Sequence, residues 1–184
     1  MMMPRRVNAA NCLTALRLLL ALPIVAAMWS GRRGLALALF AAAAATDVLD
    51  GAVARRFGLE TPFGAYLDPI ADKCLMNAVF LAMAGAGMAP WWFVAVVLGR
   101  DVYLLLAAAI LLRFTSRRKF PPSVWGKAST FVQIVTAITA LAAGMMGQPD
   151  TWIPVAALLR LSALFTIWSG VDYTWRGIAI ARAH

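Results

Sequence analysis

Long apolar runs alternate with short polar breaks along the whole chain. Each run can supply the roughly 20 residues that a membrane-spanning helix needs, and the breaks are rich in Gly, Pro and Ser, which favour turns. The chain shows no internal repeat and no linker. The pattern therefore predicts an all-α integral membrane protein in which residues 1–184 form one domain with six transmembrane helices. The predicted segments are residues 11–29, 34–53, 71–88, 91–112, 128–146 and 152–175.

Composition supports a lipid bilayer as the surroundings of these helices. The chain is 62% hydrophobic and 14% charged, whereas soluble domains average about 45–50% apolar and about 25% charged residues. Tryptophans stand near most segment ends, as in the aromatic belts of membrane proteins. The first segment, preceded by Arg5 and Arg6, also resembles a signal peptide. Asn11 and Arg17 interrupt its apolar run, which favours a retained helix.

The placement of charge predicts how the helices are oriented. A net charge of +9 is of the kind seen in nucleic-acid-binding proteins, but most basic residues here flank apolar runs, so we expect no nucleic acid partner. Basic residues beside spans mark the cytoplasmic side. With the N-terminus inside, only Arg32 and Arg33 fall outside, so both termini are predicted to be cytoplasmic. The only histidine is His184, which excludes histidine-based catalysis.

Four aspartates stand close together within residues 46–73, in a chain that is otherwise apolar. Aspartate at the centre of a span costs about 2.5–3.5 kcal/mol, so four facing lipid would cost roughly 10–14 kcal/mol. Asp47 and Asp50 are three residues apart. Asp68 and Asp72 are four residues apart, so the members of each pair share one helix face. These carboxylates must therefore line a polar cavity, pair with cations or hold metal.

Spacing alone leaves three interpretations of this acidic stretch open. Oxygen ligands without His or Cys favour hard divalent cations such as Mg²⁺ or Mn²⁺, whose sites commonly leave positions for substrate phosphates. Alternatively, Arg55, Arg56 and Lys73 neutralise the carboxylates, or the aspartates form a proton relay in a transporter. Gly51 and Ala54 follow the first two aspartates by four residues. The same helix face thus has little side chain and would let a ligand approach the backbone.

The spacing within this stretch resembles the signature of the CDP-alcohol phosphotransferases, a family of membrane enzymes. Eight positions match the signature within a stretch of 26 residues, without a gap. Residues 11–17 also resemble the first helix of that family. With x for any residue, the matching positions are Asp47-x2-Asp50-Gly51-x2-Ala54-Arg55-x8-Gly64-x3-Asp68-x3-Asp72.

The resemblance implies a homodimeric six-helix enzyme with its active site open to the cytoplasm, and we expect it in the inner membrane of a bacterium. Such an enzyme transfers a phosphatidyl group from CDP-diacylglycerol to an alcohol and releases CMP. By resemblance, the four aspartates bind two divalent cations, Mg²⁺ or Mn²⁺, and Asp72 is also the general base. The implied metal ligands are Asp47, Asp50, Asp68 and Asp72, and the implied donor-binding residues are Asp47, Gly51, Ala54 and Arg55.

Basic residues inside the apolar segments are further candidates. Because an Arg within a span is costly and by default faces an interior cavity, we expect Arg100, Lys127 and Arg160 to hold a phosphate of the acceptor. The alternative is an internal ion pair with Asp101 or Asp172. Since neighbours on a helix are about 100° apart, we expect Arg100 and Asp101 not to share a face. Weaker site candidates are Asn11, Thr14, Arg17 and Lys73.

The acceptor alcohol is less sharply indicated than the reaction. The first segment and residues 67–73 resemble the branch with glycerol-type acceptors, which contains phosphatidylglycerophosphate synthases and cardiolipin synthases. Residues 99–102 and 126–130 are slightly closer to the cardiolipin type. The sequence therefore leans to phosphatidylglycerol, with glycerol 3-phosphate a close second. Inositol phosphate or serine is the alternative within the family, and a small proton-coupled transporter is the alternative from another class.

Overall fold

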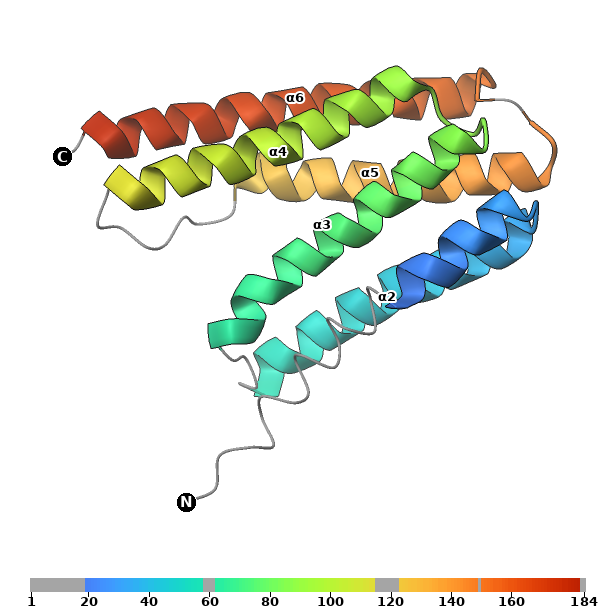
Figure 1. Cartoon of the computed structure of the whole chain (residues 1–184), viewed down its shortest axis with the longest axis horizontal. Coiled ribbons are helices and arrows are strands. Elements are labelled where there is room, and N and C mark those ends of the chain that lie inside the picture. The colour runs from blue at the N-terminus through green and yellow to red at the C-terminus, as the bar shows by residue number, and fades with distance from the viewer. Residues whose placement is uncertain (1–18, 58–61, 115–122, 149, 183–184) are drawn as a thin grey trace.

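The chain folds into helices throughout the part that the structure describes. The computed structural model covers residues 19–57, 62–114, 123–148 and 150–182, and places the side chains of these ranges outside 47–71, 111–114 and 180–182. The predicted all-α class is confirmed, and six helices are present (Figure 1). They are a first helix over Leu19–Trp29, then α2 (Arg33–Phe57), α3 (Pro62–Gly85), α4 (Trp91–Phe114), α5 (Val124–Met145) and α6 (Ile153–Arg182).

Successive helices run in opposite directions between the two ends of the bundle (Figure 1). The turn end carries the connections at residues 30–32, 86–90 and 146–152. The opposite end, called the acidic end below, is where α2, α4 and α6 stop and where α3 and α5 begin. This alternation is what the predicted N-in, C-in topology requires.

Glycines with left-handed backbone close the three turns. Gly31, Gly87 and Gly147 have φ of 73°, 69° and 69°, a conformation that glycine adopts without steric cost. Hydrogen bonds such as Met88 N to Met83 O, 2.8 Å, then return the chain toward the next helix. The breaks predicted at residues 30–31, 88–90 and 147–148 coincide with these turns.

One predicted boundary is wrong by a wide margin. The helix predicted from residue 71 begins at Pro62 instead, so that Asp68 lies within α3. The break was predicted at residues 58–64, and the helix was predicted to begin only after Pro69. Proline suits the first position of a helix because its missing N–H has no partner there anyway, and membrane helices tolerate an interior proline. The correction places both predicted aspartate pairs on continuous helix.

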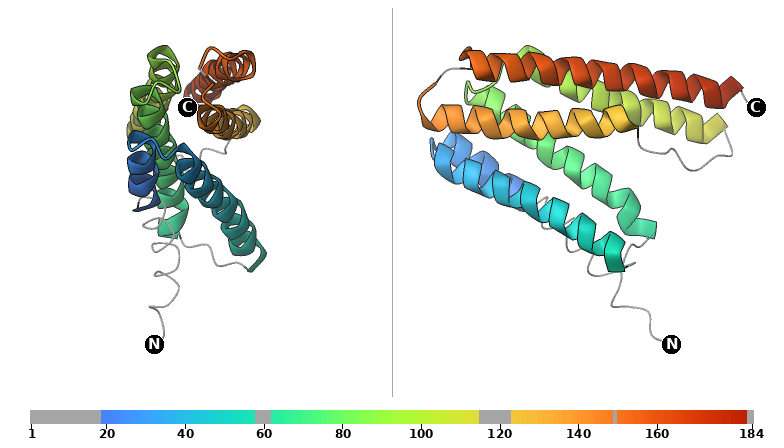
Figure 2. Two further views of the ribbon diagram at one scale, coloured as in Figure 1. Left: turned by 90° about the vertical axis from the view of Figure 1, so that its right-hand side faces the viewer. Right: turned by 180° about the vertical axis from the view of Figure 1, so that it is seen from behind.

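The interior changes character along the bundle. Helices α5 and α6 pack along each other, α4 packs on α6, α2 on α5 and α3 on α4, while α2 and α3 lean away from the other three toward the acidic end (Figure 2). In α4, α5 and α6 the buried apolar residues come nearer the turn end. The buried polar residues come nearer the acidic end, with Ser162 at the boundary. They are Arg100, Asp101, Ser129, Gln133, Thr136, Ser162, Thr166 and Ser169.

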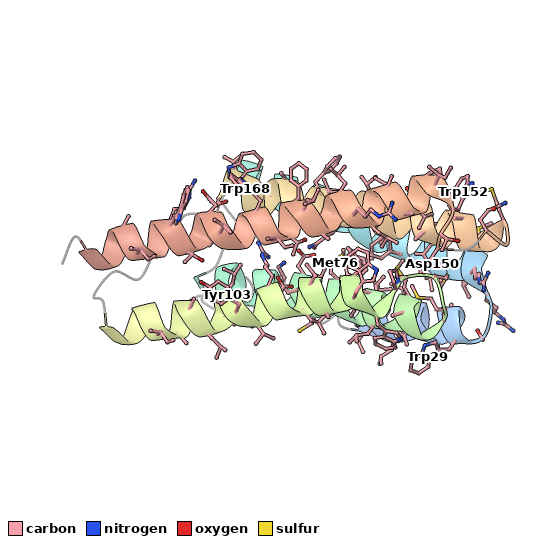
Figure 3. The ribbon with its side chains drawn as sticks, turned by 90° about the horizontal axis from the view of Figure 1, so that it is seen from above. Trp29, Met76, Tyr103, Asp150, Trp152 and Trp168 are labelled. Atoms are coloured by element: carbon pink, nitrogen blue, oxygen red, sulfur yellow. The ribbon has the colours of Figure 1, made fainter. Side chains whose placement is uncertain are left out.

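Three described helices have the length and composition of membrane spans. These stretches are Trp91–Ile110, Val124–Met145 and Ile153–Ala179. Trp29, which lies at the turn end (Figure 3), is exposed, and so are Trp91 and Trp125 at the starts of α4 and α5. Exposed tryptophans at the ends of apolar helices suit the interfaces of a bilayer. These three helices are therefore long and apolar enough to cross a membrane.

Candidate active site

The backbone of α2 and α3 brings the four aspartate positions to matching heights. Helix α2 ends at Phe57 and α3 begins at Pro62, both at the acidic end (Figure 1). An α-helix rises 1.5 Å per residue, so Asp50 lies about 10 Å before the end of α2 and Asp68 about 9 Å after the start of α3. By the same count Asp47 and Asp72 each lie about 15 Å from these ends. Counted from the ends of α2 and α3, the four aspartate positions therefore fall at two matched heights.

The side chains of most of these residues lie outside the described part of the structure. This holds for Asp47, Asp50 and Asp68 and for the predicted donor-binding residues Gly51, Ala54 and Arg55, so their roles stay predictions. Among the side chains that are described, no group of three acidic, Cys or His residues is placed to bind a metal ion. Asp72 is half-buried and interacts electrostatically with Lys73. The candidates of the first segment, Asn11, Thr14 and Arg17, also lie outside the described residues.

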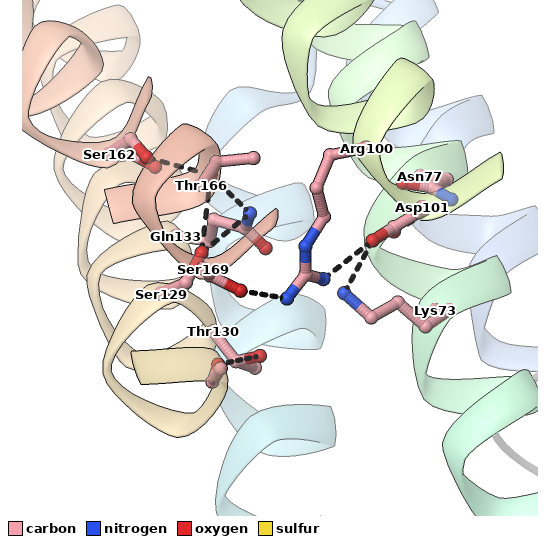
Figure 4. A network of polar contacts seen from close by, with 11 residues as sticks. Lys73, Asn77, Arg100, Asp101, Ser129, Thr130, Gln133, Ser162, Thr166 and Ser169 are labelled. Carbon is pink, nitrogen blue, oxygen red and sulfur yellow. Dashed lines mark hydrogen bonds and ion pairs between the residues drawn. The ribbon is translucent and has the colours of Figure 1, made fainter. Parts of the chain in front are cut away.

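A charged cluster of Lys73, Arg100 and Asp101 lies between α3, α4 and α6 (Figure 4). Asp101 Oδ1 is 2.8 Å from Lys73 Nζ and 2.8 Å from Arg100 Nη1. Asn77 Nδ2 is 3.4 Å from the other carboxylate oxygen. Arg100 and Asp101 are buried, and the cluster combines two cations with one carboxylate. A weak candidate, Lys73, therefore joins a strong one, Arg100, at one site.

The alternative of an internal ion pair with Asp101 is confirmed for Arg100, although the two residues were expected not to share a helix face. Their Cα positions do differ by about 100° around the helix, yet the two side chains form a direct ion pair. Arginine reaches its partner because its long side chain can bend across the helix surface and present several donors. The other predicted partner, Asp172, pairs instead with Arg176 one turn further along α6, at 2.9 Å.

Helix α6 holds Arg100 from the opposite side. Arg100 Nη2 donates a hydrogen bond to the Ser169 hydroxyl, and the guanidinium carbon lies 5.9 Å from the centre of the Tyr173 ring. A cation over an aromatic face is attracted by the ring's quadrupole. Arg100 Nε is buried and has no hydrogen-bond partner within the described residues. The guanidinium is thus held from two sides, by Asp101 on α4 and by Ser169 and Tyr173 on α6.

Tyr173 also fixes the start of α5, where Lys127 lies. The Ser123 N–H donates to the Tyr173 hydroxyl at 3.1 Å, and the Ser123 hydroxyl accepts from the Gly126 N–H at 3.1 Å as the cap of α5. A Cβ at Gly126 would lie only 3.1 Å from the Tyr173 ring. The ring that supports Arg100 therefore also sets the place of the helix turn that carries Lys127, an exposed residue.

Arg160 does not join this group. It is exposed on α6, nine residues before Ser169, a separation of about 14 Å along a helix. The described geometry therefore gathers Arg100 with Lys73 and places Lys127 near the same end. It separates the third predicted acceptor-binding residue from them.

A neutral cluster of Ser129, Gln133 and Thr166, which was not predicted from the sequence, lies between α5 and α6 (Figure 4). Gln133 Nε2 donates to Thr166 Oγ1 at 2.9 Å, and the Ser129 and Thr166 hydroxyls are 3.2 Å apart. A signal was present. Polar residues recur at intervals of four and three at positions 129, 133 and 136 of α5 and at 162, 166 and 169 of α6. This spacing marks one helix face.

The chain is similar over most of its length to known proteins of one family. A family model described as CDP-alcohol phosphatidyltransferase matches residues 7–168, which include the four aspartates and the charged cluster. The protein named "Probable phosphatidylglycerophosphate synthase" from Mycobacterium tuberculosis (strain CDC 1551 / Oshkosh) is 37% identical over 184 residues, covering 95% of this chain and 83% of that protein. The CDP-diacylglycerol–glycerol-3-phosphate 3-phosphatidyltransferase of Escherichia coli (strain K12) is 32% identical over 140 residues, covering 73% of this chain and 74% of that protein.

Proposed function

This chain belongs to the CDP-alcohol phosphatidyltransferase family, and within that family we propose that it transfers a phosphatidyl group from CDP-diacylglycerol to glycerol 3-phosphate. The observation that carries the proposal is the family match over residues 7–168, together with two relatives whose names specify phosphatidylglycerophosphate synthesis or glycerol 3-phosphate. These names favour glycerol 3-phosphate over phosphatidylglycerol, so the slight lean of the sequence toward cardiolipin synthesis is not supported.

The donor set of the acidic stretch suits two divalent cations. Asp47, Asp50, Asp68 and Asp72 offer only carboxylate oxygens, which Mg²⁺ and Mn²⁺ prefer, and their positions lie at two matched heights on α2 and α3. In the proposed site these four residues would hold the ions. When bound, the ions would neutralise charge on the diphosphate of the donor.

The remaining roles fall to groups of the chain itself. The acceptor hydroxyl oxygen attacks the phosphorus that carries diacylglycerol, the bond to CMP breaks, and Asp72 takes the hydroxyl proton. Gly51 and Ala54 would let the donor approach α2, and Arg55 would contact its phosphates. Arg100, held beside Lys73 by Asp101, would bind the acceptor's phosphate, and Lys127 is a further candidate for that role. Arg160 lies about 14 Å along α6 from Ser169, which holds Arg100, and is no longer a candidate for the same phosphate.

We further propose the membrane setting of this reaction. The six helices would all span the inner membrane of a bacterium, with both termini and the acidic end facing the cytoplasm, where the soluble acceptor is found. Residues 1–184 would act as one domain, and two copies would form the enzyme. The alternation of helix directions and the basic residues near the acidic end support this orientation.

The proposal is tested by identifying the lipid product. The full chain is purified in detergent, reconstituted with CDP-diacylglycerol and Mg²⁺ or Mn²⁺, and incubated separately with glycerol 3-phosphate, phosphatidylglycerol, inositol phosphate and serine. We expect CMP release and phosphatidylglycerophosphate only with glycerol 3-phosphate, and no turnover in excess chelator. Cardiolipin formed from phosphatidylglycerol would reassign the acceptor. Absence of CMP with every acceptor would reject the transferase function altogether.

A further inference from the structure

One buried carboxylate serves two basic side chains from different helices. Asp101 Oδ1 lies 2.8 Å from Lys73 Nζ on α3 and 2.8 Å from Arg100 Nη1 on α4. Asn77, also on α3, contacts the second carboxylate oxygen at 3.4 Å. Asp101 therefore ties α3 to α4 through charge as well as through packing (Figure 4).

Burial makes Arg100 in particular depend on this carboxylate, whereas the side chain of Lys73 is 33% exposed. Asp101 is 6% exposed and Arg100 is 9% exposed. Removing one partner of a buried ion pair leaves an uncompensated charge, which is strongly unfavourable. Without the carboxylate, the ammonium and the guanidinium would also repel each other across the short distance that one oxygen now bridges. Both groups would then move.

We propose that Asp101 is a positioning residue that fixes Arg100 for the acceptor by holding Arg100 and Lys73 with one carboxylate. The inference rests on the proposed function, in which Arg100 binds the phosphate of the acceptor. Asp101 acts through Arg100 and Lys73 rather than on a substrate. Its contacts with α3 fix Arg100 relative to the helix that carries Asp72, the proposed base. Ser169 and Tyr173 complete the support from α6.

The first test measures how strongly Asp101 restrains Lys73, and it needs no substrate. The chain has only three lysines, Lys73, Lys119 and Lys127, so acylation by a water-soluble succinimidyl ester can be located by mass spectrometry. In Asp101→Asn we expect labelling of Lys73 to rise about tenfold relative to the exposed Lys127, the factor that corresponds to one charge-assisted hydrogen bond. An unchanged ratio would overturn the inference.

The second test separates the two substrates. Asp101→Asn should raise the KM for glycerol 3-phosphate by about ten- to a hundredfold, while the KM for CDP-diacylglycerol stays near the wild-type value. Asp101→Glu, which keeps the charge, should recover most of the loss. Asp150→Asn, the same change in the turn between α5 and α6, is the matched control and should leave both values unchanged. An equal rise in both KM values would overturn the positioning role.

A double variant guards against a simple folding defect. The cluster carries +1 in the wild type (two cations, one carboxylate), +2 in Asp101→Asn and +1 again in Asp101→Asn with Lys73→Met. We expect the double variant to regain thermal stability while its KM for glycerol 3-phosphate stays raised. If the KM for glycerol 3-phosphate returned to the wild-type value together with thermal stability, Asp101 would serve only to balance charge. That result would overturn the inference.

The two proposals fail in different ways. A wild-type protein that releases no CMP would reject the proposed function, even with the change in Lys73 labelling intact. If the enzyme is active and Asp101→Asn changes neither the labelling of Lys73 nor the KM for the acceptor, the positioning role is rejected. The proposed function would then still stand.

Discussion

The two halves of the bundle differ in what they bury. Toward the turn end, the interior is apolar and includes Phe80, Phe93 and Leu141. Toward the acidic end, the same layer of helices buries Arg100 and Gln133 instead. Buried charge adds little to the stability of a membrane helix bundle and is costly when unpaired. We infer that the turn half holds the helices together and that the acidic half keeps its polar groups for chemistry.

The largest effect is expected from Asp72→Asn in the acidic half. An amide cannot take the acceptor's proton, so kcat should fall by about 10²–10⁴-fold, with thermal unfolding and CDP-diacylglycerol binding near wild type. CMP release at saturating substrates and a donor-binding titration measure this. Full activity of Asp72→Asn would show that Asp72 is not the base. If the fraction of folded protein fell as much as the activity, the contrast between the two halves would not hold.

In the turn half, the expected large effect is on stability rather than on turnover. Phe80 is fully buried and packs edge to face on Phe93, with ring centres 5.0 Å apart. Phe80→Ala should lower the free energy of unfolding by about 3–5 kcal/mol, measured by thermal unfolding in detergent, with activity per folded molecule retained. Leu81→Ala, at the exposed neighbouring residue, is the control and should change little. Loss of activity in fully folded Phe80→Ala would contradict the division.

A matched pair of glycines on α5 sharpens the comparison. A Cβ at Gly126 would lie 3.1 Å from the rigid Tyr173 ring, whereas a Cβ at Gly144 would meet the flexible side chains of Met88 and Arg33 at 2.9 and 3.3 Å. Gly126→Ala should cost about 1–3 kcal/mol through overpacking and should lower kcat/KM for the acceptor. Gly144→Ala should cost less, because flexible side chains can move aside, and should leave kcat/KM unchanged. Equal effects of the two variants on kcat/KM would argue against the comparison.

The smallest effect is expected within the acidic half itself, at the neutral cluster. Gln133 is buried and donates to Thr166 at 2.9 Å. Hydrogen bonds between membrane helices contribute on average about 0.6 kcal/mol, so Gln133→Leu should shift thermal unfolding slightly and leave transfer intact. Parallel melting and product assays would check this. A strong loss of transfer at unchanged stability would move the neutral cluster into the functional site.

Much of the fold could be predicted from the sequence because apolar runs of spanning length leave few alternatives. The turns at Gly31 and Gly147 were anticipated for the same reason. The start of α3 was not, because Gly64 and Pro69 are ambiguous: the same residues break soluble helices and are tolerated in membrane helices. Local sequence cannot decide between the two outcomes without knowledge of the neighbouring helices.

The candidate site was predictable in part for a different reason. Aspartates at helical spacing are too costly in lipid to be accidental, so Asp68 and Asp72 stood out at once. The pairing of Lys73 and Arg100 with Asp101 depends on how three helices approach one another, and it joins residues 28 positions apart in the chain. Angular position on one helix was a poor guide there, since a long side chain reaches well beyond its own face.

The turns closed by the three left-handed glycines limit which probes can be used at the turn end of the bundle. Each turn closes within a few residues. Among the described residues, the turn end therefore has very little loop that a protease, an antibody or an impermeant label could reach. Reporter groups and affinity handles belong at the other face, where α6 ends at Arg182.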